Sequence, residues 1–235
     1  MKKKLTDIIK RFPILSNILR FLSGKSNPVG YEKDIQGKNN NLKFGEAYFT
    51  NCKFDISGDY NEVVIMDSAS FTNVKFYIRG NNNRIVIANN VRFNRGGELW
   101  IEDENCEITI GLNSTFEEVH IAVTEPHSKV TIGEDCMFAN DIDIRTGDSH
   151  SIIDVQTNSR INYAQNIAID NHVWVAAHVS ILKGVTLSSN SVVATRSVVT
   201  KKFDNGNILI GGSPAKVLKE NITWDRKRIL KTETA

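Results

Sequence analysis

The residues of this chain best suited to acid–base chemistry are its five histidines. A neutral imidazole can accept a proton near pH 7, which is what a general base must do to activate a hydroxyl group. His150 lies in the polar segment Asp148-Ser149-His150-Ser151, and the repeat pattern described below places it on an exposed turn outside the core. We therefore predict that His150 acts as a general base.

The other histidines fit this role less well. His127 is expected in the same column of turns as His150, one coil away, either as a surface residue or in the same groove. His172 and His178 occupy the same position of successive six-residue repeats, so they should point from different corners and not meet at one metal ion. The sequence therefore predicts no metal site.

Two further groups of side chains could belong to a site with His150. Trp174 is expected at a turn-facing position of its repeat, where a tryptophan serves either interface packing or a binding site. Polar residues near the His150 turn could bind the hydroxyl groups of a sugar: Asp143, Asp154, Arg160, Asn162 and Tyr163. Aspartate and asparagine also hydrogen-bond the backbone of such turns, so both interpretations stay open.

A repeat of 22 or 23 residues predicts the elements that position these side chains. Its two apolar series are Ile65, Ile87, Ile110 and Ile132 and, eleven residues before each, Phe54, Phe76, Leu99 and Ile121. A period in this range indicates stacked coils, none of which can bury its apolar face alone. Ile144 extends the second series, which puts His150 in the following turn and Val155 at the next buried position.

Beyond residue 163 the period shortens to six residues. Large aliphatic side chains recur at Ile169, Val175, Ile181, Leu187, Val193 and Val199. A period of six fits neither a helix, whose seventh residue lies off the starting face, nor a strand of strict alternation. Short strands joined by tight turns fit it, with three repeats to one triangular coil. We predict a solenoid of about eight coils.

The composition excludes several classes of protein. The 235 residues are 40% hydrophobic, and no apolar run approaches the roughly 18 residues that span a bilayer. Residues 1–25 carry seven Lys and Arg side chains and one Asp, a net +6; because the whole chain is +2, the remainder is about −4 and lacks the basic excess of a nucleic-acid-binding protein. Cys52, Cys106 and Cys136 lie far apart, which predicts buried thiols in a reducing compartment.

We predict four parts: an N-terminal amphipathic helical segment at 1–25, a linker at 26–43, a β-helix at 44–212 and a C-terminal cap or tail at 213–235. Apolar residues of the first segment recur at spacings of three and four, with a bend near Pro13. This helix packs on the body or on a neighbouring subunit, or it lies on a membrane surface, since cationic residues flank its apolar stripe. The expected location is the cytoplasm, with membrane association left open.

Five ordered motifs accompany the repeats: Asp148-Ser149-His150-Ser151, Asn171-His172-Val173-Trp174-Val175, Ile181-Leu182-Lys183-Gly184-Val185, Ser197-Val198-Val199-Thr200-Lys201 and Gly212-Ser213-Pro214-Ala215-Lys216. Together they resemble the hexapeptide-repeat acyltransferases, and among these the sugar and capsular-polysaccharide O-acetyltransferases. The resemblance is good over about residues 132–220. It implies an all-β fold, a left-handed parallel β-helix, and a homotrimer with active sites at subunit interfaces. It also implies acetyl transfer from acetyl-CoA to a carbohydrate acceptor.

The resemblance assigns roles to individual residues. It implies that Trp174 lies beside the catalytic histidine and helps to position the acyl group or the oxyanion. It implies coenzyme contacts at Ala177, Thr195, Thr200, Lys201, Lys216 and Lys219. The short side chains at 177 and 195 would leave room for the pantetheine arm, and the lysines would meet the phosphates. Arg196 stands where this family usually has a glycine.

Two other functions stay open at this point. The chain could be an N-acetyltransferase that acts on an amino sugar nucleotide, or a solenoid without catalytic activity that serves as a scaffold. A scaffold has no use for a corner histidine, a tryptophan segment and a lysine-flanked slot together, so O-acetyl transfer to a glycan of a capsule or lipopolysaccharide is the favoured prediction.

Overall fold

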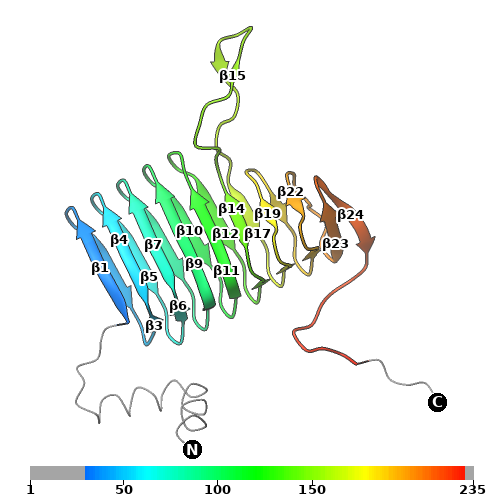
Figure 1. Ribbon diagram of the computed structural model, residues 1–235, viewed down its shortest axis with the longest axis horizontal. Helices are drawn as coiled ribbons and strands as arrows, with labels where there is room; N and C mark the ends of the chain where they lie inside the picture. The colour runs from blue at the N-terminus through cyan, green and yellow to red at the C-terminus, as the bar shows by residue number, and fades with distance from the viewer. Residues whose placement is uncertain (1–29, 231–235) are drawn as a thin grey trace, which may run out of the picture.

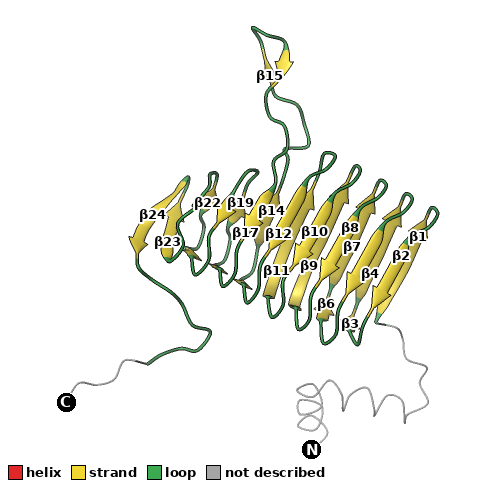
Figure 2. Cartoon of the chain, turned by 180° about the vertical axis from the view of Figure 1, so that it is seen from behind, coloured by secondary structure: helices red, strands yellow, loops and turns green. Residues whose placement is uncertain are grey.

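Alternating burial along short strands builds this fold, because in the coils between the two ends of the solenoid every second side chain of most strands points inward. In β4 (Cys52–Ser57) and β7 (Val74–Arg79), for example, buried and half-buried residues alternate without interruption. The computed structural model describes residues 30–230, and these strands stack in parallel into a three-sided solenoid (Figures 1 and 2). The number of turns is about eight, as the repeats predict.

Three columns of strands form the faces of the prism. Face 1 contains β1 (Tyr31–Gln36), β4, β7, the second parts of β9 (Arg92–Glu102) and β11 (Thr115–Val123), β14 (Ile142–Arg145), β19 (Ser180–Ile181) and β22 (Val198–Val199). Face 2 contains β2 (Asn41–Phe44), β5 (Glu62–Ile65), β8 (Arg84–Ile87), β10 (Glu107–Ile110), β12 (Lys129–Ile132), β17 (Ile167–Ile169) and β20 (Thr186–Leu187). Face 3 contains β3 (Tyr48–Thr50), β6 (Ser70–Thr72), the first parts of β9 and β11, β13 (Met137–Phe138), β18 (Trp174–Val175), β21 (Val192–Val193) and β23 (Ile208–Gly212).

The core lies inside the prism and consists of the predicted apolar series. All the series members named above are buried, with relative exposures of 2% or less, except Val155. Phenylalanines stack along the axis at equivalent positions of successive coils. The ring centroids of Phe93 and Phe116 lie 4.4 Å apart, and those of Phe116 and Phe138 lie 4.7 Å apart. Burial of one apolar column through many coils is what joins the coils into a single unit.

Left-handed backbone conformations form the corners. In the six-residue repeats the turn residue has a positive φ at His172, His178, Gly184, Asn190 and Arg196, with values between 55° and 77°. Such a conformation favours glycine because a Cβ atom costs energy there. The backbone at Arg196, with a φ of 58°, is therefore one that a glycine would adopt without this cost.

The first coil begins earlier than the sequence suggested. β1 and all but the last residue of β2 lie within 26–43, the range predicted as a linker, so that prediction is wrong for these residues. The reason is that the polar residues of this segment form a corner of the solenoid: Asn40 Nδ2 donates to Gly58 O at 2.8 Å, and Asn40 Oδ1 accepts from Asn61 N at 2.9 Å. The helical segment predicted at 1–25 lies outside the described residues.

An arm, defined here as residues 147–165, projects from the prism between face 1 and face 2 (Figure 1). It carries the short antiparallel strands β15 (Ile153–Asp154) and β16 (Ser159–Arg160). The expected core position of Val155 is therefore wrong: this side chain is 95% exposed on the arm. Ile169, which pairs with Ile132, occupies the buried position after the excursion. Repeat counting cannot detect an insertion of this kind.

The C-terminal coils end in an antiparallel pair. β24 (Ala215–Glu220) reverses direction and pairs with β23 at the edge of the sheet. Residues 221–230, which we call the strap, then continue from β24 (Figure 2). Among residues 30–230 no helix is long and apolar enough to cross a membrane.

Candidate active site

His150 lies at the base of the arm, and it is exposed as predicted from its turn position. Its backbone N–H donates to Asp148 O at 2.7 Å, and its carbonyl oxygen accepts from Asn162 Nδ2 at 2.7 Å. Within residues 30–230 the imidazole ring itself makes no hydrogen bond. The backbone of His150 is thus fixed while its ring is free to meet a substrate.

Asn162 organises the base of the arm. This side chain is 6% exposed, and its Nδ2 also donates to Asp148 Oδ2 at 2.8 Å. Its Oδ1 accepts from Ile152 N at 2.7 Å and from Arg160 Nε at 3.1 Å. The hydrogen-bonding groups of Asn162 are therefore engaged within the chain, and the contact with His150 is structural. Its predicted contact with a sugar stays a prediction.

Ion pairs fasten the same region to the prism. Lys183 pairs with Asp148, and its Nζ donates to Asn162 O at 3.0 Å. The hydrogen bond from Lys183 lowers the pKa of Asp148, so this carboxylate is charged at neutral pH. Arg160 pairs with Glu125, and its guanidinium lies 5.0 Å from the centre of the Tyr163 ring. Two of the residues predicted to bind a sugar, Arg160 and Tyr163, thus lie in the arm that carries His150.

Two sugar-binding candidates remain. Asp154 lies on the arm, where its Oδ1 accepts from the backbone N–H groups of Gln156 and Thr157 at 2.9 and 2.8 Å. Asp143 lies on β14 of face 1. Arg145 donates to it twice, at 2.7 Å from Nε and from Nη2, and His120 Nδ1 lies 3.0 Å from its Oδ1. Burial alone would raise the pKa of Asp143, but the hydrogen bonds from His120 and Arg145 lower it to about 2. Its charge is therefore neutralised by partners of its own chain.

This ion cluster predicts how stability changes in acid. The folded pKa of Asp143 lies below the value of about 3.9 that an unfolded aspartate has, so its stabilising effect is complete above pH 4 and is lost as the pH falls toward about 2. We expect Asp143→Asn to cost about 1 to 2 kcal/mol at pH 7, after allowance for solvent screening. The melting temperatures of the wild type and of Asp143→Asn, measured between pH 7 and pH 2, should become equal at the acid end. A difference in melting temperature that stays constant with pH would contradict a stabilising role of the Asp143 charge. So would a difference no larger than that of the exposed control Asp204→Asn.

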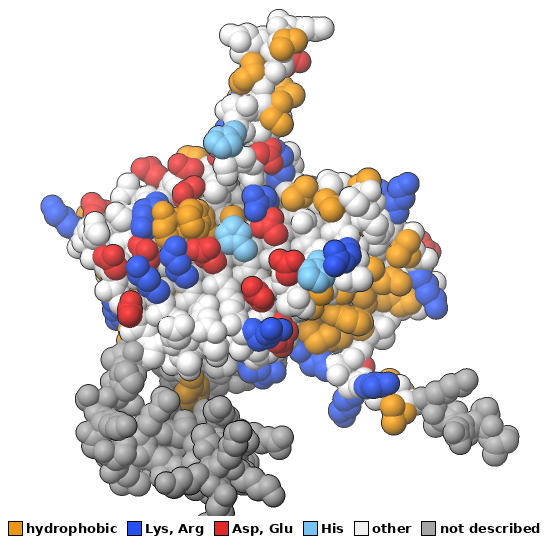
Figure 3. Space-filling view, in the orientation of Figure 1, with side chains coloured by type: hydrophobic (Ala, Val, Ile, Leu, Met, Phe, Trp, Pro, Cys, Tyr) orange, Lys and Arg blue, Asp and Glu red, His pale blue; other side chains and the backbone are white. Residues whose placement is uncertain are grey.

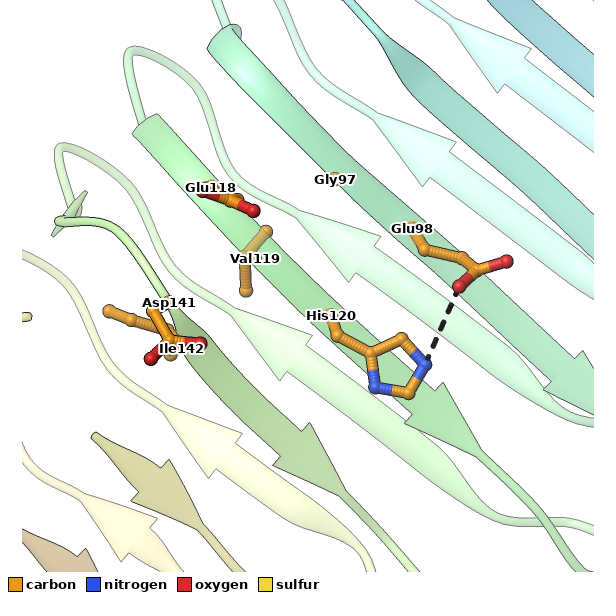
Figure 4. A pocket seen from close by; sticks show the side chains of 7 residues that line it. All are labelled: Gly97, Glu98, Glu118, Val119, His120, Asp141 and Ile142. Carbon is orange, nitrogen blue, oxygen red and sulfur yellow. Dashed lines mark ion pairs between the residues drawn. The ribbon is translucent and has the colours of Figure 1, made fainter. Parts of the chain in front are cut away.

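A shallow hollow of about 260 Å³ lies on face 1 next to this cluster (Figure 4). It is lined by Gly97, Glu98, Glu118, Val119, His120, Asp141 and Ile142. The Nε2 atom of His120 lies 3.9 Å from Glu98 Oε2. Sequence reasoning missed this feature, although outward residues of paired strands, such as Glu98 and His120, share a register. Among residues 30–230 no group of three or more His, Cys, Asp or Glu side chains could hold a metal ion.

Trp174 lies in a different column from His150. It is the first residue of β18 on face 3, half-buried, with Met137 and Val192 as its register partners in the neighbouring coils. His150 follows β14 of face 1. One prism therefore presents these two residues from different sides, and the chain alone does not bring them together.

The predicted coenzyme residues all lie in the C-terminal coils, in three places. Ala177 and Thr195 share the corner between faces 3 and 1, where Thr195 Oγ1 donates to Ala177 O at 2.8 Å. Thr200 and Lys201 directly follow β22, and both are exposed. Lys216 and Lys219 are exposed on β24. These groups surround the end of the prism that has the shortest coils.

Side chains of several kinds mark the visible side of the molecule (Figure 3). Hydrophobic groups follow the arm, and acidic, basic and histidine side chains are interspersed on the face below it. A parallel β-solenoid with six-residue repeats, an exposed histidine at the base of the arm and a tryptophan segment on a different face defines the class of hexapeptide-repeat acyltransferases.

Comparison with known proteins narrows this class. No family model matches the chain. The polysialic acid O-acetyltransferase of Neisseria meningitidis is 36% identical over 193 residues, which cover 82% of this chain and 88% of that protein. The polysialic acid O-acetyltransferase of Escherichia coli O1:K1 is 36% identical over 126 residues, which cover 54% of this chain and 40% of that protein's length.

Comparison with solved structures leads to the same group of enzymes. The polysialic acid-specific acetyltransferase NeuO superposes with a TM-score of 0.76 at 33% identity over 87% of this chain and 92% of that one. The polysialic acid O-acetyltransferase OatWY gives 0.78 at 32% identity over 86% of this chain and 95% of that one. The chain therefore belongs to the hexapeptide-repeat acetyltransferase family that includes these O-acetyltransferases, and the predicted left-handed parallel β-helix and acyltransferase class are confirmed.

Proposed function

We propose that the protein transfers an acetyl group from acetyl-CoA to a hydroxyl group of a capsular polysaccharide or a related glycan. The observation that carries this proposal is the 36% identity with an O-acetyltransferase over 88% of that enzyme's length. The structure adds an exposed histidine at the base of the arm, whose backbone is held by Asn162 and whose ring makes no hydrogen bond within residues 30–230. Because His150 is exposed, an acceptor too large to enter a closed cavity could still reach it.

His150 is the general base of the proposed reaction. Its ring nitrogen takes the proton of the acceptor hydroxyl while the oxygen attacks the thioester carbonyl carbon. The tetrahedral intermediate carries a negative charge on the former carbonyl oxygen, which a backbone N–H donor must stabilise. Collapse of the intermediate breaks the carbon–sulfur bond, and the protonated imidazole returns its proton to the leaving coenzyme A thiolate. Trp174 bounds the acetyl group in this scheme.

The acyl donor occupies the C-terminal coils in this proposal. Ala177 and Thr195 leave a corner with short side chains, where a pantetheine arm could run along the prism. Lys201, Lys216 and Lys219 supply mobile positive charges for the phosphates of the coenzyme. No metal ion takes part in this scheme, because the histidine supplies the base and the thiolate is a good leaving group.

A homotrimer completes the site in this proposal. His150 and Trp174 lie in different columns of one prism, so a cyclic assembly could bring His150 of one subunit to Trp174 of the next. The arm also exposes apolar side chains that a neighbouring subunit could cover: Ile152, Ile153, Val155, Ile161 and Tyr163. Exposed apolar groups that gather in this way mark interaction surfaces.

Release of free thiol from acetyl-CoA tests the function. We expect release that depends on a glycan acceptor, with ester acetyl signals in the NMR spectrum of the product. The acceptors to compare are polysialic acid, a neutral capsular polysaccharide and an amino sugar nucleotide. Amide products alone would support N-acetylation, and a protein that neither binds the coenzyme nor releases thiol would be a scaffold.

A further inference from the structure

The strap runs back over the prism after β24. Ile222 N donates to Asn207 O at 2.9 Å, beside the last coil. Farther along, Arg226 donates to Cys136 O at 3.0 Å and to Thr115 Oγ1 at 2.8 Å. The strap therefore crosses several coils along the corner between faces 2 and 3.

Trp224 is the buried centre of the strap, with an exposure of 8%. Its ring stacks on the His172 ring, with centroids 4.2 Å apart and planes 8° apart. Its Nε1 donates to His172 O at 2.8 Å, and its own carbonyl oxygen lies 3.0 Å from His172 Nε2. Ring contact and hydrogen bonds together fix the position of Trp224.

Asp135 contacts both His172 of the prism and Arg226 of the strap. Its Oδ2 lies 2.7 Å from His172 Nδ1, and its Oδ1 accepts from Arg226 Nε at 2.9 Å. Burial alone would raise the pKa of Asp135, but the hydrogen bonds from His172 and Arg226 lower it. The carboxylate is therefore charged at neutral pH and holds the strap next to the turn that precedes Trp174.

Trp224 also lies beside Trp174. Their ring centroids are 6.2 Å apart and their planes make an angle of 51°. Tilted aromatic pairs at this distance attract each other. The register partners Met137 and Val192 flank Trp174 along its own column, whereas Trp224 reaches it from the strap, outside the solenoid.

We propose that Trp224 is a positioning residue, and that the strap holds the Trp174 ring in the orientation that bounds the acetyl group. This inference rests on the proposed function, in which Trp174 lies next to the reacting group. A displacement of about 1 Å in such a group can cost far more in rate than in stability. The strap contains none of the residues proposed to bind the coenzyme, so its effect falls on turnover and not on donor affinity.

A double-mutant cycle tests the coupling. Trp224→Ala should lower kcat about tenfold and leave KM for acetyl-CoA within about twofold, whereas Trp224→Phe, which keeps a ring on His172, should retain most activity. In a Trp174→Phe background, Trp224→Ala should change kcat less than about twofold, because the two residues act through one group. If the double variant instead lost kcat by the product of the two single-variant losses, the residues would act independently and the proposal would be overturned. Lys227→Ala, an exposed change on the same strap, is the matched control and should leave kcat unchanged.

A measurement independent of activity separates this inference from the proposed function. In protein labelled with 5-fluorotryptophan, the ¹⁹F signal of Trp174 can be assigned by its loss in Trp174→Phe. Trp224→Ala should shift or broaden that signal, and Lys227→Ala should not. If Trp224→Ala does not fold, Arg226→Ala, which releases the strap without removing the ring, should give the same change to a smaller extent. If the enzyme is active but the Trp174 signal is unchanged in both Trp224→Ala and Arg226→Ala, the positioning role is overturned. A responsive signal in a protein that transfers no acetyl group overturns the proposed function instead.

Discussion

His150→Ala is expected to reduce acetyl transfer by roughly 10²- to 10⁴-fold, because it removes the proposed general base, the group that would accept the hydroxyl proton. Its stability should change by no more than about 0.5 kcal/mol, since the exposed ring makes no hydrogen bond within the described residues. The backbone bonds to Asp148 and Asn162 do not depend on the side chain. Steady-state kinetics and a thermal melt of the same preparation measure both quantities.

Matched histidine variants sharpen this comparison. His127 occupies a left-handed corner position, and His178 is a left-handed corner residue whose Nδ1 lies 2.7 Å from Asp141 Oδ2. His127→Ala and His178→Ala should therefore keep most of the activity. Near-normal turnover of His150→Ala, or a loss of activity explained by unfolding, would show that His150 is not the base.

Phe116→Ala is expected to have the largest effect on stability, about 3 to 5 kcal/mol. The Phe116 side chain is fully buried and stacks between Phe93 and Phe138, so its removal leaves a cavity in the middle of the axial column. The coils on either side cannot collapse into this cavity without disturbing their backbone pairing. Urea unfolding followed by circular dichroism, at one fixed protein concentration, measures the shift of the midpoint.

Phe116→Leu serves as the control, because it keeps most of the apolar volume and should cost clearly less. A midpoint for Phe116→Ala equal to that of Phe116→Leu would show that the column relaxes around the missing ring. In that case the core would be held mainly by the backbone pairing of the coils and not by axial packing.

The sequence predicted the solenoid well because burial in a coil repeats with the coil. Ile65, Ile110 and Val175 belong to series whose spacing alone places them inside, and the structure confirms it. The first coil was missed because Tyr31–Gln36 is largely exposed and polar, so its pairing with β4 leaves no apolar signal. The arm was missed because a projecting insertion keeps alternating apolar residues such as Ile153 and Val155, which look like a buried strand.

The site was predictable only where a residue's role depends on its own turn. His150 is exposed as its position in the repeat required. The partners that surround the candidate residues come from distant positions: Trp224 meets His172 across 52 residues, and Lys183 meets Asp148 across 35. No local pattern encodes such pairs. The roles proposed for Trp174 and the coenzyme residues involve a second chain and a ligand, and they stay predictions.

The strap gives the chain a folding order. Each coil pairs with residues 21 to 23 positions away in the first part of the solenoid, so coils can form one upon another from nearby sequence. The hydrogen bond from Arg226 to Thr115 joins residues 111 positions apart, and it can form only after the intervening coils exist. We therefore expect strap docking to be a late step. Once docked, it converts a row of coils that could fray from one end into a unit that opens cooperatively.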